Sequence, residues 1–391
     1  MEGYFLEADH FQYCKDGYYS CGDSFHSIKT ECGIISVLAD GLGSGIKASV
    51  LATLTTTMAA SFMSSRIDIK KAAEIILETL PVCSHRQIGY STFTIIDACF
   101  DGKIRIVEHD NPPYVLIRDS KIVRIDKQEI PIKTFRKSHL YYSEMQLLPG
   151  DRIVYFSDGV TQSGMGLPHL PLGWQESGVE AYLEKILREE PAASAGAICK
   201  RLAQKAWELD GNKAADDISC AALYFRNPRR TMLVTGPPYK KVHDSLMAEM
   251  IRDFEGRKII CGGTTAAIIS RELNVPMKVN LKEIRSSSEI PPTAFMQGFD
   301  LVSEGTITLS RSYRALQDET DPESLPDNAV SRLLNILLAS DIIEFVVGTK
   351  INDAHQDPAL PKDLEIRRNL MKQICHVLEK KYLKSTRIVF V

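Results

Sequence analysis

The chain lacks the features that define several large classes of protein. Its first residues, MEGYFLEADHFQY, have neither the positive n-region nor the apolar h-region of a signal peptide, and no stretch approaches the ~18 apolar residues that a membrane-spanning helix needs. Its nine cysteines are dispersed, odd in number and without a CxxC pair, which argues against a disulfide framework and a zinc site. We therefore expect a cytoplasmic protein with reduced thiols and no membrane partner.

The sequence also lacks an excess of charge of either sign. Lysine and arginine total 47 and aspartate and glutamate total 50, so the formal net charge is -3, and no basic block stands out. A nucleic-acid partner is therefore not expected. The 391 residues are enough for two domains, each with its own core.

The first block of the chain, residues 1–225, alternates strand-like and helix-like segments. Residues Asp101 and Gly102 join two strand-like runs and are typical of a hairpin turn. The predicted strands are Gly33 to Ala39, Tyr90 to Cys99, Lys103 to Glu108, Tyr114 to Arg118, Arg152 to Phe156 and Ile218 to Phe225, and the predicted helices are Ser44 to Ser64, Asp68 to Leu80, Val179 to Arg188 and Ala192 to Leu209. Hairpin-linked strands with paired helices indicate antiparallel sheets covered by helices.

The second block, residues 231–391, follows a polar, turn-forming segment from Arg226 to Arg230. Strands and helices alternate in it, which favours a mostly parallel α/β domain. The predicted strands are Met232 to Val234, Lys258 to Cys261, Leu301 to Val302, Ile342 to Val347 and Ile388 to Val391, and the predicted helices are Val242 to Phe254, Thr264 to Leu273, Ala329 to Ala339 and Leu364 to Tyr382.

Four aspartates of the first block, Asp23, Asp40, Asp158 and Asp216, occupy short turns rich in glycine or serine beside apolar runs. Glycines after such an aspartate let the backbone turn tightly enough for a carbonyl oxygen to face the same point. An oxygen-rich cluster of this kind suits two Mn²⁺ or Mg²⁺ ions. Each Asp-Gly turn alone indicates no more than a turn.

The order of four motifs resembles the SpoIIE-like branch of the metal-dependent (type 2C) protein serine/threonine phosphatases. The motifs are GDSF at Gly22, LADGLGSG at Leu38, LLPGDRIVYFSDGVT at Leu147 and AADDIS at Ala214. This resemblance covers residues 1–225 and implies an α+β fold, a four-layer α-β-β-α phosphatase sandwich. We expect a smaller α/β domain, regulatory or ligand-binding, at residues 231–391.

The resemblance also implies roles for individual residues. Asp40 matches the bridging aspartate that contacts both metal ions, and Gly41 matches the glycine whose carbonyl oxygen is a ligand. Asp158 and Asp216 match the aspartates of the second metal site, and together with Asp40 they form the expected catalytic set. Two further acidic residues rank lower: Asp23, which would act through bound water, and Asp217, the neighbour that could replace Asp216 in the motif.

The implied activity is hydrolysis of phosphoserine or phosphothreonine by a water molecule that two metal ions activate. The implied substrate is a phosphorylated bacterial regulatory protein, similar to an anti-sigma-factor antagonist. Leu42 stands where eukaryotic relatives carry a histidine, and no arginine matches their phosphate-binding arginine. The leaving-group acid and the phosphate-binding residue are therefore unassigned, and a catalytically idle signalling module is the alternative.

The second block contains one candidate ligand-binding loop. Gly262, Gly263, Thr264 and Thr265 lie between a predicted strand and a predicted helix, where free N–H groups and the helix dipole favour an anion. The loop matches neither the P-loop nor the GxGxxG pattern, so a plain glycine turn is the competing interpretation. A second enzyme or a nucleotide-binding module remains an alternative for this block, and homodimerisation is left open.

One helix of the first block allows a further hypothesis. The segment Ser44 to Ser64 is rich in small residues and directly follows Asp40 and Gly41. Packing against the sheet explains its composition. Alternatively, its small face allows the helix to shift and thereby gate metal binding, in which case a bulky residue at Ala48 or Ala52 alters metal dependence.

Overall fold

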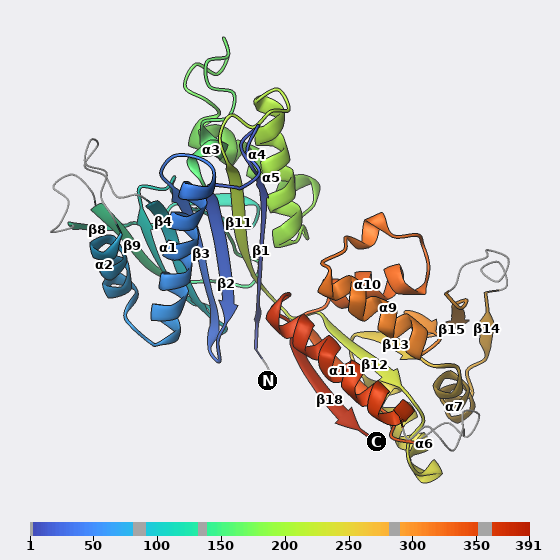
Figure 1. The fold of residues 1–391 in the computed structure, drawn as a ribbon. Coiled ribbons are helices and arrows are strands. Elements are labelled where there is room, and N and C mark those ends of the chain that lie inside the picture. The colour runs from blue at the N-terminus through green and yellow to red at the C-terminus, as the bar shows by residue number, and fades with distance from the viewer. Residues whose placement is uncertain (1–2, 81–90, 132–138, 281–289, 351–361) are drawn as a thin grey trace. The chain divides into compact units, whose positions relative to one another are not determined.

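The computed structural model describes residues 3–80, 91–131, 139–280, 290–350 and 362–391. The chain divides into two compact units, Met1–Asn227 and Pro228–Val391 (Figure 1). Each unit has its own sheets and its own hydrophobic core, and each is described by itself.

The first unit contains two antiparallel sheets. The six-stranded sheet has the order β2-β3-β4-β5-β9-β8, and the five-stranded sheet has the order β1-β11-β10-β6-β7. The strands are β1 (Phe5–Tyr13), β2 (Asp23–Lys29), β3 (Gly33–Gly41), β4 (Ser91–Cys99), β5 (Lys103–His109), β6 (Val115–Arg118), β7 (Lys121–Val123), β8 (Gln128–Pro131), β9 (His139–Gln146), β10 (Arg152–Phe156) and β11 (Ile218–Arg226).

Helices cover the outer faces of both sheets. The helices are α1 (Ile46–Ser64), α2 (Ile69–Thr79), α3 (Asp158–Thr161), α4 (Gln175–Glu189) and α5 (Ala195–Leu209). Helices α1 and α2 share a core with the six-stranded sheet, whereas α4 and α5 share one with the five-stranded sheet. The result is the predicted α+β sandwich, with the layers α-β-β-α.

Strand β3 shows how the two sheets face each other. Nearly every residue of GIISVLADG is buried, as expected for a strand covered on both faces. Ile35 and Val37 belong to the core beneath α1, while Ser36, on the opposite face, hydrogen bonds to Tyr155 of β10 at 2.6 Å. Alternate side chains of one strand therefore contact both the helices and the other sheet.

Helix α1 differs from the expectation that no segment resembles a membrane span. It has 19 residues, and an 18-residue window within it has a mean hydropathy of 1.2, so by length and composition alone it could cross a membrane. The core helix of a folded domain passes the same test. In this unit Ala48, Ala52 and Ala59 of α1 are fully buried, and two of them pack in the core of the six-stranded sheet.

The second unit is built on one seven-stranded sheet of the order β14-β15-β16-β13-β12-β17-β18. Five neighbouring strands, in the order β16-β13-β12-β17-β18, are parallel, as predicted. At one edge of the sheet β14 and β15 form an antiparallel pair. The strands are β12 (Arg230–Thr235), β13 (Arg257–Cys261), β14 (Met277–Val279), β15 (Ala294–Met296), β16 (Leu301–Ser303), β17 (Ile342–Val347) and β18 (Ser385–Phe390).

Helices pack on both faces of this sheet. One core includes residues of α6 (Asp244–Asp253) and α7 (Gly263–Leu273), and a second includes residues of α9 (Thr306–Gln317), α10 (Ala329–Ala339) and α11 (Lys362–Lys380). The described part of the unit also contains two short 3-10 turns, η1 (Lys241–His243) and η2 (Pro322–Ser324). The spatial order β16-β13-β12-β17-β18 within the sheet is that of a doubly wound fold. In such folds ligands bind beyond the carboxyl ends of the strands.

Several elements escaped the sequence analysis. Strands β1, β2 and β9 mix polar and apolar residues because each has one face only partly buried. Helix α9 buries Thr308 and Ser312 beside its leucines, which weakens its apolar periodicity. The residue Tyr90, placed at the start of a predicted strand, lies outside the described residues.

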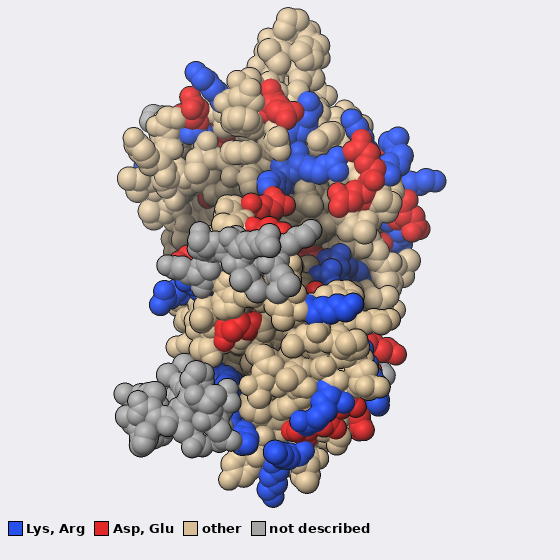
Figure 2. Space-filling model, turned by 90° about the vertical axis from the view of Figure 1, so that its right-hand side faces the viewer, with Lys and Arg blue, Asp and Glu red and all other residues tan. Residues whose placement is uncertain are grey.

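Charged side chains of both signs are interspersed over the face drawn in Figure 2, without a continuous basic area. Within the first unit some charges pair directly, as Arg201 of α5 does with Glu189 of the neighbouring helix α4. Such exposed pairs contribute little to stability, about 0–1 kcal/mol each.

Candidate metal centre

The four predicted aspartates come from strand ends in both sheets of the first unit. Asp23 begins β2 and lies directly opposite Asp40, near the end of β3, in the antiparallel register. Asp158 follows β10 and begins α3, and Asp216 lies two residues before β11. Strands β10 and β11 are paired neighbours, so their aspartates meet at the same end of the five-stranded sheet.

A glycine brings the loops after β10 and before β11 together. A Cβ atom at Gly159 would lie 2.1 Å from the backbone oxygen of Asp217, so only glycine allows this approach. Ser157 reinforces the contact because its backbone N–H donates to Ser219 and its hydroxyl accepts from the Ser219 N–H. The positions of Asp158 and Asp216 are therefore fixed by backbone packing.

Burial and neighbouring carboxylates raise the pKa values of three of these aspartates. Burial, followed by the charge of Asp158, raises the pKa of Asp40 to about 7. Burial and then the charge of Asp40 hold the pKa of Asp23 well above its usual value. Burial and then the charge of Asp216 raise the pKa of Asp158. Each raised pKa has a neighbouring carboxylate among its causes, which shows that these groups share one electrostatic environment.

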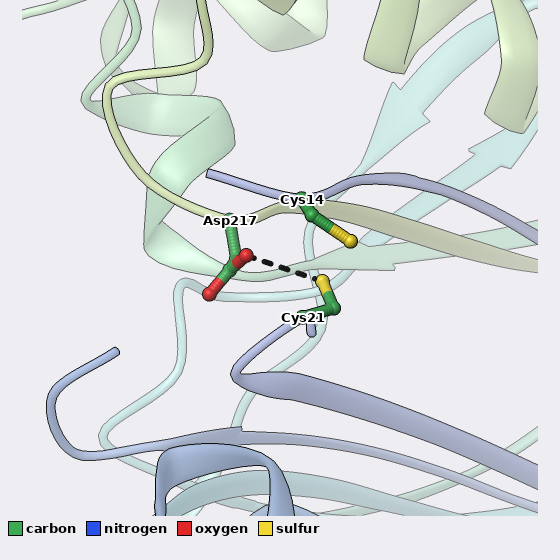
Figure 3. A group of neighbouring side chains, drawn as sticks. All are labelled: Cys14, Cys21 and Asp217. Carbon is green, nitrogen blue, oxygen red and sulfur yellow. Dashed lines mark hydrogen bonds between the residues drawn. The ribbon is translucent and has the colours of Figure 1, made fainter. Parts of the chain in front are cut away.

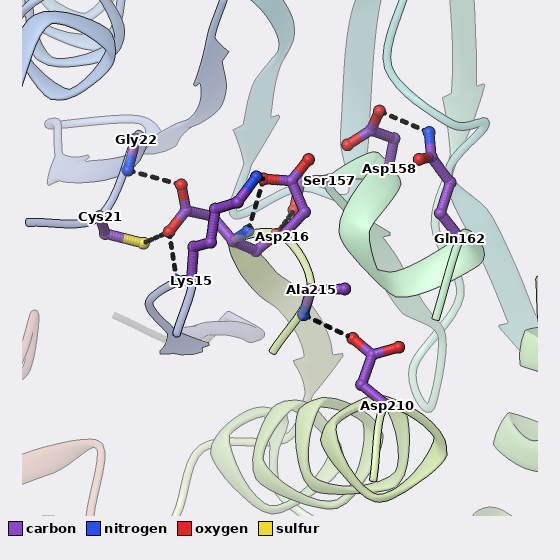
Figure 4. Close-up of polar contacts among 10 residues, drawn as sticks. Lys15, Cys21, Gly22, Ser157, Asp158, Gln162, Asp210, Ala215 and Asp216 are labelled. Atoms are coloured by element: carbon purple, nitrogen blue, oxygen red, sulfur yellow. Dashed lines mark hydrogen bonds and ion pairs between the residues drawn. The ribbon is translucent and has the colours of Figure 1, made fainter. Parts of the chain in front are cut away.

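Few groups of the described chain offset this negative charge. The Lys15 ammonium lies 3.4 Å from Asp216, and Gln162 donates to Asp158 at 2.7 Å (Figure 4). Asp23 is 4% exposed, and neither of its carboxylate oxygens has a well-formed hydrogen bond among the described residues. A buried, unsatisfied carboxylate in an acidic cluster fits a site for divalent cations.

Asp216 and Asp217, which the sequence could not separate, have different environments. Asp217 is 5% exposed and accepts hydrogen bonds from the backbone N–H groups of Lys15 and Gly22, both at 2.8 Å, and from the Cys21 thiol at 3.3 Å. The side chain of Asp216 is 44% exposed and pairs with Lys15. Asp217 thus holds the segment before β2, whereas Asp216 has oxygen lone pairs available to a cation.

Gly41 lies against the first helix. A Cβ atom there would be 2.1 Å from the backbone oxygen of Ala48 in α1, so no other residue fits without a shift. Ala48 also borders Gly22, whose Cβ would meet the Ala48 methyl group at 3.1 Å. The backbone just before Asp23 and just after Asp40 therefore packs directly on α1.

Three residues near the centre were missed by the sequence analysis. Lys15 lies in a polar turn whose spacing carries no motif, and Gln162 is visible only because it follows Asp158 by one helical turn. Cys21 was expected only to be a reduced thiol, yet it donates a hydrogen bond to Asp217. Only the Gln162 spacing offered a signal in advance.

The candidate ligand loop of the second unit gathers three strand ends. The N–H of Gly262 donates to the oxygen of Ser303 at 2.8 Å, and Gly305 and Gly236 both border Gly262. Gly262 is the N-cap of α7 and provides no side-chain cap. The Thr265 hydroxyl is buried, points back toward Gly262 and has no hydrogen-bond partner among the described residues.

One basic and one acidic side chain, those of Arg367 and Glu304, also lie at these strand ends. The guanidinium of Arg367 lies against Gly236 at the end of β12. The Glu304 carboxylate accepts from the N–H groups of Thr306 and Ile307, and so it caps α9. Cys261 is fully buried, which raises the pKa of its thiol to about 12. Of the two helix N-termini, that of α7 lacks a capping side chain.

Comparison with known proteins links the first unit to one family. The model of the family described as Stage II sporulation protein E (SpoIIE) matches residues 31–226, half of the chain. A search of curated proteins gives no match.

Solved structures resemble the same part of the chain. One contains the PP2C phosphatase domain and a fragment of the regulatory domain of the cell fate determinant SpoIIE from Bacillus subtilis; it is 19% identical, with a TM-score of 0.49, and the match covers 58% of this chain and 63% of that one. A Mycobacterium tuberculosis protein with RsbU and RsbW domains is 17% identical, with a TM-score of 0.46 and coverages of 64% and 69%. RsbX in complex with magnesium is 18% identical, with a TM-score of 0.41 and coverages of 57% and 96%. TM-scores below 0.5 are too low for these likenesses to support a function for this chain.

Proposed function

This chain belongs to the SpoIIE family of PP2C-type, metal-dependent serine/threonine phosphatases, and we propose that it is an active member that hydrolyses phosphoserine and phosphothreonine. One observation carries the proposal: burial and neighbouring carboxylates raise the pKa values of Asp23, Asp40 and Asp158, and among the described residues Lys15 pairs with this cluster through Asp216. Such repulsion destabilises the protein unless cations occupy the site, and it is therefore a feature that function, and not folding, requires.

The donor set suits two Mn²⁺ or Mg²⁺ ions. Asp40, the carbonyl group of Gly41, Asp158 and Asp216 would hold the ions, and Asp23 would act through water. Ions bound there supply a water of lowered pKa and offset the charge of the phosphate. Asp217 is assigned the structural role that its three hydrogen bonds indicate.

The surrounding residues orient these carboxylates. Gln162 holds one oxygen of Asp158 and leaves the other available. Gly41 and Gly159 allow the close backbone contacts that fix Asp40 and Asp158. A side chain locked in this way loses little entropy when it binds a cation, which favours affinity.

Lys15 is our candidate for the phosphate-binding group that no arginine supplies. Its ammonium lies at Asp216 and its side chain is 31% exposed, so it borders the centre and also contacts solvent. An ammonium is a compact donor that binds phosphate as a point charge. When Asp216 binds a cation, Lys15 becomes available to a phosphate oxygen.

The substrate that the family implies is a phosphorylated bacterial regulatory protein similar to an anti-sigma-factor antagonist. Exposed apolar groups near the centre support a protein substrate. Tyr18 contacts the N-cap Gly45 of α1, and Tyr19 and Ile46 are largely exposed beside it. Large exposed aromatic and aliphatic groups are typical of surfaces that bind other proteins. A cytoplasmic location and a homodimer stay predictions.

The test is hydrolysis of an aryl phosphate and of a phosphoserine protein by the full chain, with Mn²⁺, with Mg²⁺ and with a chelator. We expect activity with either metal, none with chelator, and a loss of at least about a thousandfold in Asp158→Asn. Asp119→Asn is a matched control, because Asp119 is an exposed aspartate in the β6–β7 turn. Its neighbour Arg118 pairs with Asp151, which precedes β10, whereas Asp158 follows the other end of that strand. Activity that ignores metal and Asp158→Asn would exclude this function. Intact folding and metal binding without activity would favour the idle signalling module.

For the second unit we propose binding of a phosphate-bearing small molecule or another anion at the N-terminus of α7. The uncapped helix, the buried Thr265 hydroxyl and the nearby Arg367 support it. Gly262, Gly263, Thr264 and Thr265 would surround the anion, and the unit would act as a regulatory domain.

A further inference from the structure

Two cysteines meet beside the metal centre. The sulfur atoms of Cys14 and Cys21 and a carboxylate oxygen of Asp217 all lie within 4.8 Å of one another (Figure 3). Cys14 is exposed and Cys21 is buried. Both belong to the segment that joins β1 to β2. Cys14 is therefore accessible to solvent, whereas Cys21 is enclosed by the protein.

This segment positions the acidic side chains before β11. The backbone N–H groups of Lys15 and Gly22 and the Cys21 thiol all donate to Asp217, and the Lys15 ammonium pairs with Asp216. The Asp16 N–H also donates to the oxygen of Ala214 at 2.9 Å. Asp23, one of the buried carboxylates, follows directly on Gly22. A movement of the segment is therefore transmitted to Asp216 and Asp23.

We propose that Cys14 and Cys21 form an oxidisable dithiol, and that their disulfide weakens metal binding at the neighbouring centre. The effect on catalysis rests on the phosphatase function proposed above, whereas disulfide formation and the effect on metal binding do not.

The oxidant of this reaction is a peroxide. The sulfur of Cys14, the accessible one, attacks one oxygen of hydrogen peroxide, the O–O bond breaks, and a sulfenic acid and one water form. The sulfur of Cys21 then attacks the Cys14 sulfur, the S–O bond breaks, and the hydroxyl group leaves with the Cys21 proton as a second water. Two thiols have lost two electrons and two protons, and one peroxide has become two waters.

Disulfide geometry explains the effect on the centre. The two sulfur atoms must come to about 2.05 Å, so the segment between β1 and β2 has to contract. The Cys21 thiol also loses the proton that it donates to Asp217. Groups that orient metal ligands typically change metal affinity by 10–100-fold when they are lost, and we expect a weakening of roughly tenfold or more. Thiol reductants reverse the bond, as in a redox-sensing cytosolic dithiol.

The chain provides a matched control for this pair. Cys32 is another exposed cysteine, and it neighbours Cys99 at the opposite end of β3 from Asp40. Oxidation there leaves the segment around Cys21 untouched. Cys32→Ser therefore controls for a general effect of removing an exposed thiol, and Cys14→Ser removes only the accessible member of the proposed pair.

The experiment treats the reduced full chain with hydrogen peroxide and maps linked peptides by mass spectrometry. It then measures the Mn²⁺ dissociation constant by calorimetry before oxidation, after it, and after dithiothreitol. In the wild type and in Cys32→Ser we expect a Cys14–Cys21 link and a dissociation constant that rises roughly tenfold and recovers with reductant. In Cys14→Ser we expect no link and no change.

Two results overturn the proposal: the absence of a Cys14–Cys21 link under peroxide, or a link that leaves the Mn²⁺ dissociation constant unchanged. Neither readout requires turnover, which separates this proposal from the phosphatase function. If the protein forms the link and binds Mn²⁺ more weakly, yet never hydrolyses a phosphate ester, the phosphatase function is refuted and the redox proposal stands. An active phosphatase that forms no link refutes the switch alone.

Discussion

Both units place their chemically distinctive loops at strand ends, but with opposite electrostatics. In the first unit, Asp23, Asp40 and Asp158 bring carboxyl groups together, and burial and neighbouring carboxylates raise their pKa values. In the second, glycines, a buried threonine hydroxyl and an arginine surround the start of α7. The first arrangement attracts cations and the second attracts anions. Strand ends thus provide the position, and the residues placed there determine the ligand.

The two sites also differ in how much each destabilises its folded unit. Uncompensated carboxylates destabilise the metal-free first unit, because each elevated pKa reflects charge that the folded state disfavours. The uncapped start of α7 leaves backbone donors without a side-chain cap, which is a far smaller penalty. Single substitutions can test this difference, and the largest effect is expected in the first unit.

Asp40→Asn separates function from stability most clearly. Removing the carboxylate opposite Asp23 eliminates the proposed bridging ligand, so we expect activity to fall by at least about a thousandfold. The same change relieves repulsion, and we expect the metal-free melting temperature to rise by about 3 °C or more. Activity assays and thermal unfolding with chelator measure the two effects. A variant that loses activity and also melts lower without metal contradicts the electrostatic account.

Ala48→Leu tests whether α1 controls the centre. Ala48 is fully buried between Gly41 and Gly22, so extra methyl groups force a shift that costs about 1–3 kcal/mol. We expect a shift in the Mn²⁺ concentration that gives half-maximal activity, by roughly tenfold. Val50→Leu is the matched control, since Val50 is on the same helix and 60% exposed. An unchanged Mn²⁺ titration in a folded Ala48→Leu variant counts against a coupling between helix and metal.

Lys15→Ala tests the proposed phosphate-binding group. We expect the KM for an aryl phosphate to rise by roughly tenfold, because a charge-assisted hydrogen bond to the substrate is lost. Lys15→Arg keeps the positive charge and should recover much of the difference. Steady-state kinetics at saturating Mn²⁺ distinguish this role from an effect on the metals, which would shift the Mn²⁺ titration instead. An unchanged KM in Lys15→Ala removes Lys15 from the proposed site.

How far the sequence anticipates this arrangement depends on what fixes each residue. The strands around Asp40 and Asp158 are continuous apolar runs, so they and the fold class were predictable. The β2–β3 register that places Asp23 opposite Asp40 was not, because β2 is a short, mixed edge strand.

The separation of Asp216 from Asp217 depends on contacts 195 to 202 residues away along the chain. Spacing within AADDIS contains no information about Lys15, Cys21 or Gly22, which hold Asp217. The same reason explains why Lys15, which pairs with Asp216, was invisible to motif analysis. Local patterns predict strand ends, and only the fold brings distant loops together.

The stability of the metal-free protein should fall as pH rises. The folded-state pKa of Asp40 is raised to about 7, and those of Asp23 and Asp158 are raised too. A carboxyl group with a raised pKa binds its proton more tightly in the folded state, so stability is greater at lower pH and is lost as pH rises through the folded value. We expect the metal-free melting temperature to decrease between about pH 4, where the carboxyl groups of the unfolded chain ionise, and about pH 7, the folded-state pKa of Asp40. Asp40→Asn should flatten this profile, and an equally steep profile in that variant excludes Asp40 as its cause.

The smallest effect should come from the second unit, where Gly263 offers a direct comparison with α9. A Cβ atom at Gly263 would meet nothing within 4 Å, so both Gly263→Ala and Gly263→Asp should fold. The aspartate would place a carboxylate at the start of α7, as Glu304 already does at α9.

We expect inorganic phosphate to raise the melting temperature of the wild type and of Gly263→Ala by about 1–2 °C, and to leave Gly263→Asp unchanged. Calorimetric titration with phosphate gives the corresponding dissociation constants. If Gly263→Asp still binds phosphate as the wild type does, the anion lies elsewhere. If neither the wild type nor Gly263→Ala responds, the start of α7 is a plain glycine turn, and the contrast between the units reduces to a cation site in one and no ion site in the other.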